Sequence, residues 1–141
     1  MIGVQTCALP IYLAAANQGN RKAMHNLAVA YAEGSAGPKN TEEAARWFAQ
    51  AAALGLSDSQ FNLAVLYERG DGVPQSLIDS YKWYSIAAAG GDAESKARIT
   101  MLKTQLSATD RQAAERAAQN FRPEAPNRIA NVPPEPGDFG G

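Results

Sequence analysis

The sequence predicts an all-α fold, a solenoid of αα-hairpins that stack side by side. The first observation is a pair of matching stretches, MHNLAVAY at Met24–Tyr31 and QFNLAVLY at Gln60–Tyr67. The second is their fixed spacing, since Asn62 follows Asn26 by 36 residues. A period of this length is typical of helical repeats, each of which buries its apolar face against its neighbours.

The same period holds for aromatic, glycine and proline positions outside these stretches. It links Tyr31 to Tyr67, Gly34 to Gly70, Pro38 to Pro74, Trp47 to Trp83 and Gly55 to Gly91. An aromatic residue follows each tryptophan, and these aromatic pairs could also be an aromatic ligand cage. Because they recur at the repeat period, we predict instead that Trp47, Phe48, Trp83 and Tyr84 are core residues.

The first eleven residues do not fit the repeat. Pro10 aligns with Arg46 and Lys82, which are mid-helix positions in the later copies, and proline there costs about 3 kcal/mol. The string from Gly3 to Ile11 also resembles a translated sequencing adapter, so we interpret residues 1–11 as a non-native leader. A processed targeting segment is the alternative, although the sequence lacks the basic stretch that opens such segments.

Residues 12–106 are expected to hold one partial repeat, two full repeats and one degenerate repeat. Asn20 is a plausible N-cap, and Asn40 with Glu43 and Ser76 with Asp79 look like capping boxes. Glycines end the helices, because glycine adopts the left-handed conformation without strain. The expected helices cover residues 12–18, 20–33, 40–54, 58–69 and 76–89. We call the first helix of each repeat, 20–33 and 58–69, the A-type helix and its partner the B-type helix, and a third A-type helix starts near residue 91.

The repeat pattern decays after this point. Arg98-Ile-Thr-Met101 replaces Asn-Leu-Ala-Val, and Ser107 to Thr109 then cap a last helix from residue 110 to 121. We assign residues 107–122 as the capping helix that solenoids need at their ends. Residues 123–141 are rich in proline and unable to bury a core, so we predict a disordered tail.

Composition excludes several classes of function. The formal net charge of −1 gives no basic footprint for nucleic acid, and no apolar run approaches the roughly 20 residues that insertion into a membrane requires. The only histidine, His25, aligns with Phe61 and is expected to fill a planar side-chain slot. With one histidine and one cysteine, we predict no catalytic site, no metal and no cofactor.

A partner-binding groove is the one candidate site. On its helix, Asn26 shares a face with Lys22, Val29 and Glu33, and the inward face carries Leu27, Ala28 and Tyr31. The asparagine amides could bond the backbone of an extended peptide. Alternatively, the asparagines bond neighbouring helix ends and the charges form a solvated face. The candidate groove residues are Lys22, Asn26, Glu33, Asp58, Asn62, Arg69 and Arg98.

Residues 12 to about 106 resemble the Sel-one-like repeat, a longer relative of the tetratricopeptide repeat. The resemblance lies in Asn-Leu-Ala-x-x-Tyr-x-x-Gly, in the Gly-Val-Pro turn and in Trp-(Phe/Tyr)-x-x-Ala-Ala. It implies a right-handed superhelix that acts as a non-enzymatic scaffold for protein partners, in many cases in the bacterial cell envelope. A glycan- or peptidoglycan-binding surface and a regulatory domain of an upstream enzyme are the alternatives.

A narrower resemblance concerns the C-terminal repeats of alphaproteobacterial polar-localisation factors. It lies in Ala23–Val29, in Asp58–Leu63, in Ser80–Tyr84 and in the tail from Asn127 to Pro134. This likeness implies polar localisation on the periplasmic side of the envelope, close to peptidoglycan. A cytoplasmic location remains open, because the sequence shows no membrane span.

Overall fold

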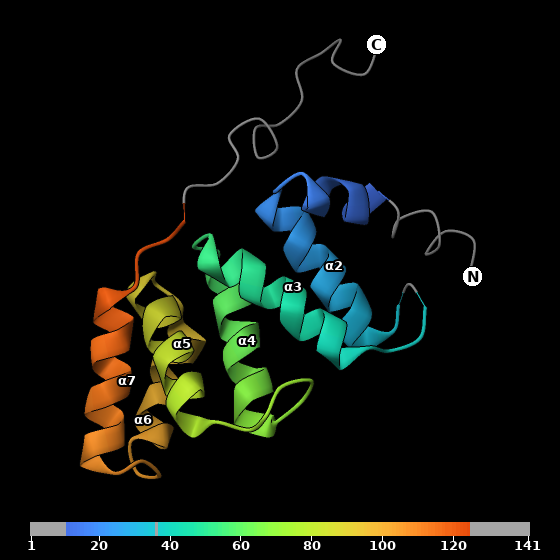
Figure 1. Ribbon diagram of the computed structural model, residues 1–141. Coiled ribbons are helices and arrows are strands. Elements are labelled where there is room, and N and C mark those ends of the chain that lie inside the picture. The colour runs from blue at the N-terminus through green and yellow to red at the C-terminus, as the bar shows by residue number, and fades with distance from the viewer. Residues whose placement is uncertain (1–10, 36, 125–141) are drawn as a thin grey trace.

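The computed structural model describes residues 11–35 and 37–124, and the described chain is all-α. The predicted leader, apart from Ile11, and the predicted tail beyond Glu124 lie outside the described residues. After a helical stretch at 11–17, the chain forms α2 (Arg21–Glu33), α3 (Thr41–Ala53), α4 (Ser57–Arg69), α5 (Leu77–Ala89), α6 (Ala93–Leu102) and α7 (Ala108–Asn120). Successive helices stand side by side as hairpins (Figure 1), which confirms the predicted fold class.

Side-chain caps fix where most of these helices begin. The side chains of Asn20, Asn40 and Ser76 each accept a hydrogen bond from the backbone N–H three residues on. Asp92 and Ser107 do the same at α6 and α7. The last helix therefore starts directly after Ser107, two residues earlier than the sequence predicted. No side chain caps α4, which begins at Ser57 rather than at residue 58.

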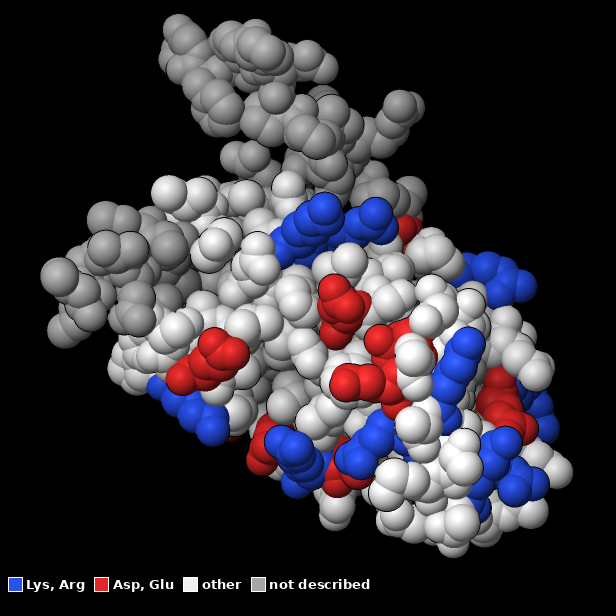
Figure 2. Space-filling view, turned by 180° about the vertical axis from the view of Figure 1, so that it is seen from behind, with Lys and Arg blue, Asp and Glu red and all other residues white. Residues whose placement is uncertain are grey.

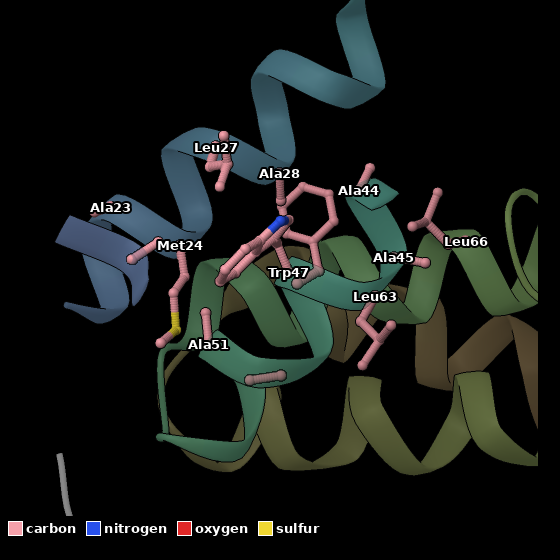
Figure 3. Close-up of a cluster of buried hydrophobic side chains, with 13 residues drawn as sticks. Ala23, Met24, Leu27, Ala28, Ala44, Ala45, Trp47, Ala51, Leu63 and Leu66 are labelled. Atoms are coloured by element: carbon pink, nitrogen blue, oxygen red, sulfur yellow. The ribbon is translucent and has the colours of Figure 1, made fainter. Parts of the chain in front are cut away.

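The apolar faces meet in two clusters that follow the repeats. The first joins α2, α3 and α4 around Leu27, Trp47 and Leu63 (Figure 3). The second joins α4, α5, α6 and α7 around Tyr81, Tyr84 and Leu102. Alanines fill many of the remaining buried positions, so the helices pack at short distances.

The two tryptophans differ in burial. Trp47 is 4% exposed, as predicted for a core residue. Trp83 is half-buried instead and packs against both clusters. The Nζ atom of Lys82 lies 4.7 Å from the centroid of its ring, and Phe121 meets it edge to face at 5.7 Å.

The planar slot predicted for His25 is present in both repeats. The rings of His25 and Phe48 lie 5.5 Å apart between centroids, and those of Phe61 and Tyr84 lie 5.6 Å apart. Each residue of the second pair follows its counterpart by 36 positions. His25 thus occupies the place of a core aromatic, as the alignment predicted.

A close approach ties the turn after α4 to the preceding repeat. Gly72 has a φ of 75°, and a Cβ atom on it would lie 2.2 Å from the carbonyl oxygen of Thr41 at the start of α3. Any other residue would be strained by this dihedral angle and would overlap the backbone of α3.

The segment after α7 turns back along the repeats. Pro123 lies against Gly55, and the backbone N–H of Glu124 donates to the carbonyl of Ala53 over 2.8 Å. The predicted disordered tail began at residue 123, so its first two residues differ from that expectation. They are held by backbone and proline contacts that composition does not reveal.

Candidate functional site: a groove between α4 and α6

A groove of about 460 Å³ lies between α4 and α6. On α4, Asn62, Val65 and Arg69 are spaced three and four apart and therefore share one face of that helix. Three predicted site residues, Asn62, Arg69 and Arg98, lie together in this groove. The lining residues are Phe61, Asn62, Val65, Arg69, Glu94, Ala97 and Arg98.

The other predicted site residues do not line this groove. Lys22, Asn26 and Glu33 are exposed along α2, and Asp58 is exposed in the first turn of α4. Of the predicted wall, this groove therefore includes the part on α4 and α6.

The amide of Asn62 is the polar group that the groove leaves unused. Asn62 is half-buried, and within the described ranges its side chain makes no hydrogen bond. The same holds for the exposed amide of Asn26. The alternative in which these asparagines bond neighbouring helix ends is thus not seen among the described residues.

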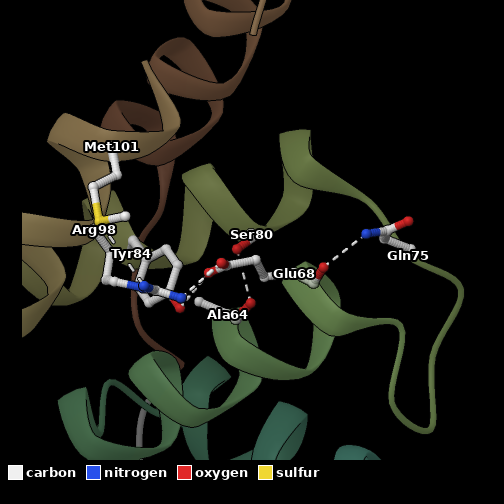
Figure 4. A network of polar contacts seen from close by, with 7 residues as sticks. All are labelled: Ala64, Glu68, Gln75, Ser80, Tyr84, Arg98 and Met101. Carbon is white, nitrogen blue, oxygen red and sulfur yellow. Dashed lines mark hydrogen bonds and ion pairs between the residues drawn. The ribbon is translucent and has the colours of Figure 1, made fainter. Parts of the chain in front are cut away.

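The groove ends at a polar network that joins three helices (Figure 4). Arg98 Nη2 on α6 donates to Glu68 Oε2 on α4 over 2.6 Å. The hydroxyl of Tyr84 on α5 donates to the other carboxylate oxygen of Glu68 over 2.9 Å. Burial, with a contribution from Glu68, raises the pKa of Tyr84 to about 12, so the hydroxyl remains a donor.

Sequence reasoning missed Glu68 and the role of Tyr84. Glu68 departs from the repeat pattern, because it aligns with Ala32, whereas Tyr84 adds a hydroxyl to the ring position of Phe48 and shares it with Tyr12. Arg98 departs as well, since it stands where the earlier copies carry Asn26 and Asn62. Two charged departures of opposite sign, Glu68 and Arg98, at one junction between repeats are the signal that could have revealed the network.

Apolar residues also recur at the repeat period on these helices. Val29, Val65 and Met101 are related by the 36-residue period, and the side chain of Met101 is 56% exposed. In the groove, Phe61, Val65 and Ala97 supply apolar contact area. The lining includes no serine, cysteine or histidine, so its chemistry suits binding by contact and hydrogen bonding.

His25 is the other titratable group of interest. Its Nδ1 lies 2.8 Å from Ser59 Oγ, a contact that joins α2 to α4. Ser59 is 0% exposed, which keeps its hydroxyl from reaching a substrate. Burial lowers the pKa of His25, and the carboxylate of Asp58 opposes this effect. The pair is therefore a structural contact between repeats.

Surface charge gives no single-sign patch on the face seen in Figure 2, where acidic and basic side chains are interspersed. In the described part of the chain, no helix is both long and apolar enough to cross a bilayer. Partner recognition on this face would depend on individual charges rather than on a broad field.

Comparison with known proteins supports the assignment of repeats. A protective antigen of uropathogenic Escherichia coli with an SLR fold matches 80% of this chain with a TM-score of 0.77 and 27% identity. A Sel1 repeat protein from Oxalobacter formigenes matches 60% with a TM-score of 0.59 and 32% identity. The matches span 24% of the first protein and 64% of the second. No curated protein matches the sequence.

The family model described as Sel1 repeat matches residues 21–56 and 57–92, which is half of the sequence. Each match covers one hairpin, α2 with α3 and α4 with α5. The matched repeats also contain α4, the helix that supplies most of the groove. The resemblance seen in the sequence is thereby confirmed, and the chain belongs to the Sel1 repeat family.

Proposed function

We propose that the chain is a non-enzymatic protein-interaction module whose groove between α4 and α6 binds an extended peptide of a partner protein. The observation that carries this proposal is the half-buried amide of Asn62, which has no hydrogen-bond partner among the described residues. An amide offers both a donor and an acceptor, the pair that one residue of an extended backbone presents.

The neighbours of Asn62 divide into contact and selectivity groups. Phe61, Val65 and Ala97 supply apolar surface for side chains of the peptide. Arg69 and Glu94 are exposed and of opposite sign, so they favour a peptide with complementary charges at its two ends. Arg98 also lines the groove, but its charge is already paired with Glu68, so its side chain contributes shape rather than a free charge.

We also propose a setting in the bacterial cell envelope, on its periplasmic side. The support for this is the resemblance to envelope repeat proteins and the similarity to a protein described as a protective antigen. A polar location within the cell is the finer form of this proposal and rests on the narrower sequence resemblance alone.

The test selects random peptides displayed on phage with the wild-type chain and measures the affinity of the selected peptides for variants. Asn62→Ala is expected to weaken binding at least tenfold, because a lost buried amide costs about 1–3 kcal/mol and 1.4 kcal/mol is a factor of ten. Asn26→Ala is the matched control, since it changes the same repeat position outside the groove. The double variant should bind no more weakly than Asn62→Ala.

Equal affinity of the wild type and Asn62→Ala would contradict the proposed groove. If Asn26→Ala alone weakens binding tenfold, the binding surface lies on α2 instead. Cosedimentation with insoluble peptidoglycan is run in parallel. Wild-type sedimentation that Asn62→Ala abolishes, with no peptide selected, would replace the peptide by a glycan partner.

A further inference from the structure

The C-terminal ends of α3, α5 and α7 lie along one edge of the solenoid (Figure 1). At the end of α3, the backbone N–H groups of Leu54, Gly55 and Leu56 donate to carbonyls of the last turn, and their counterparts 36 positions later do the same at the end of α5. Because the backbone is the same at both ends, a difference between them must come from the side chains nearby.

An arginine caps the end of α3 but not the end of α5. The Nη1 atom of Arg21 donates to the carbonyl oxygen of Leu54 over 3.2 Å. Their counterparts in the second repeat are Ser57 and Gly90. No group in the described ranges donates to the carbonyl of Gly90. The second repeat therefore lacks the guanidinium group that closes the same helix end in the first.

The end of α7 has the same kind of cap as the end of α3. The Nη1 atom of Arg122 donates to the carbonyl oxygens of Gln119 and Phe121 over 2.9 and 2.8 Å. A guanidinium group is thus bonded to carbonyls at the ends of α3 and α7, and the end of α5 is the exception.

The uncapped end of α5 forms part of the wall of a pocket of about 410 Å³, which we call the edge pocket. A Cβ atom on Gly90 would lie 2.7 Å from Ser57 Oγ, so this hydroxyl lies directly beside the helix end. Gln60 is 2% exposed, and its Nε2 donates to the Ala52 carbonyl over 3.1 Å, which leaves its Oε1 atom without a partner among the described residues. The pocket therefore gathers hydrogen-bond acceptors that have no donor.

We propose that the edge pocket binds a guanidinium group of a partner, in the place that Arg21 takes one repeat earlier. The planar fork of N–H donors bonds the Gly90 carbonyl together with the oxygens of Ser57 and Gln60. The negative end of the α5 dipole favours a cation, and the positive end of α4 is offset by Asp58 in its first turn.

The remaining lining suits the same ligand. Among the described residues it carries no charged side chain, so no lysine or arginine of the lining already satisfies the acceptors. Phe121 meets Trp83 edge to face with centroids 5.7 Å apart, and it adds an aromatic ring on which a guanidinium group can stack. Ile86 and Pro123 give apolar surface for an alkyl stem. The ligand is therefore a guanidinium group on an alkyl stem, as in an arginine side chain.

NMR titration of the full chain with Nα-acetyl-arginine methylamide tests the site. We expect saturable shifts of the backbone amide signals of Ser57, Gly90 and Gly91. The citrulline analogue has the same length but no charge and should bind about tenfold more weakly, because hydrogen bonds from a charged donor are roughly twice as strong. Ethylguanidinium identifies the source of the ligand. Equal affinity for ethylguanidinium indicates a small free guanidinium compound, and weaker binding indicates an arginine within a polypeptide.

Two variants locate the bound group. Ser57→Arg supplies a guanidinium group at the end of α5 from within the chain, as Arg21 does at the end of α3, and should abolish the saturable shifts. Ala113→Arg is the matched control, since it adds the same charge at an exposed position of α7 that does not line the pocket. It should leave the affinity unchanged.

The absence of saturable shifts in the wild type would overturn the proposal, and so would equal affinity for the arginine and citrulline compounds. Shifts confined to Asn62 and Val65 would overturn it as well, since the guanidinium group would then lie in the groove between α4 and α6. The wild-type titration decides by itself even if Ser57→Arg fails to fold. The outcome is independent of peptide binding in that groove, because the two sites share no lining residue.

Discussion

Arg98 on α6 donates to Glu68 on α4 over 2.6 Å, at the repeat position where the two preceding copies carry asparagine. The ion pair joins the degenerate third repeat to the second full repeat. Asn62, which lines the same groove as Arg98, makes no side-chain hydrogen bond among the described residues. The network thus serves both the packing of the repeats and the shape of the groove.

The two partners of this ion pair should not contribute equally to stability. Glu68→Ala removes the acceptor of the buried Tyr84 hydroxyl and should cost about 1–3 kcal/mol. Arg98→Ala leaves that hydrogen bond intact and should cost about 0–1 kcal/mol, because both side chains are partly exposed. Urea unfolding measures both. Adding Tyr84→Phe to Glu68→Ala should recover part of the loss, whereas strictly additive losses would show that the hydroxyl and the carboxylate act independently.

His25 should make stability fall on acidification. Burial lowers its pKa in the folded state, so the fold favours the neutral ring. The contribution is present above the unfolded value of about 6.5 and is lost as pH falls through the folded pKa. Melting temperatures at pH 7.5 and pH 5 should therefore differ more in the wild type than in His25→Phe, which copies the equivalent Phe61. An identical difference in both proteins would assign the effect to carboxylates.

Tyr81 and Tyr84 should give a second loss of stability at high pH. Burial and hydrogen bonds to Glu115 and Glu68 raise the pKa of each to about 12. Because the folded value exceeds the unfolded one of about 10, their stabilisation is intact below pH 10 and is lost as pH rises towards 12. Absorbance titration should show both tyrosinates forming late. Tyr81→Phe and Tyr84→Phe should each remove one late group, and ionisation of all tyrosines near pH 10 would contradict the burial.

The tryptophans should differ in their cost of truncation. Trp47→Ala removes a side chain that is 4% exposed and should cost about 3–5 kcal/mol. Trp83→Ala should cost less, because this ring is half-buried and rests partly on Phe121. Urea unfolding of both variants is the measurement. Equal losses would show that Trp83 is as much a core residue as the sequence predicted.

Gly72 should be intolerant of substitution. Gly72→Ala combines a left-handed backbone, worth about 1–2 kcal/mol, with an overlap on Thr41 that adds about 1–3 kcal/mol. Gly37→Ala is the matched control, since that glycine also has a positive φ but its new Cβ would meet no atom. Thermal unfolding should separate the two variants, and equal melting temperatures would refute the close approach.

The sequence predicted what the 36-residue period encodes. Helix order, caps such as Asn20 and Asn40, and the slot of His25 against Phe48 all follow from residues that recur or that have strong local preferences. The same reasoning placed seven residues on one concave wall, and of these only Asn62, Arg69 and Arg98 line the groove between α4 and α6.

What the period does not encode could not be predicted. Glu68 occurs once at its repeat position, so its contact with Tyr84 depends on a distance between helices that no local pattern reports. The half-burial of Trp83, whose ring meets Phe121 from beyond the repeats, likewise follows from packing that the period does not report. Composition likewise gave no signal that Glu124 would bond Ala53.

The contact between Gly72 and the Thr41 carbonyl bears on how such proteins are lengthened or rebuilt. A hairpin that replaces α4 and α5 behind α2 and α3 must carry glycine at position 72, or its turn clashes with the backbone at Thr41. Conversely, a library that randomises the surface of α4 while keeping Gly72 would retain the close contact between this turn and the start of α3. Glycine at position 72 is thus a requirement for any hairpin that is exchanged into this place.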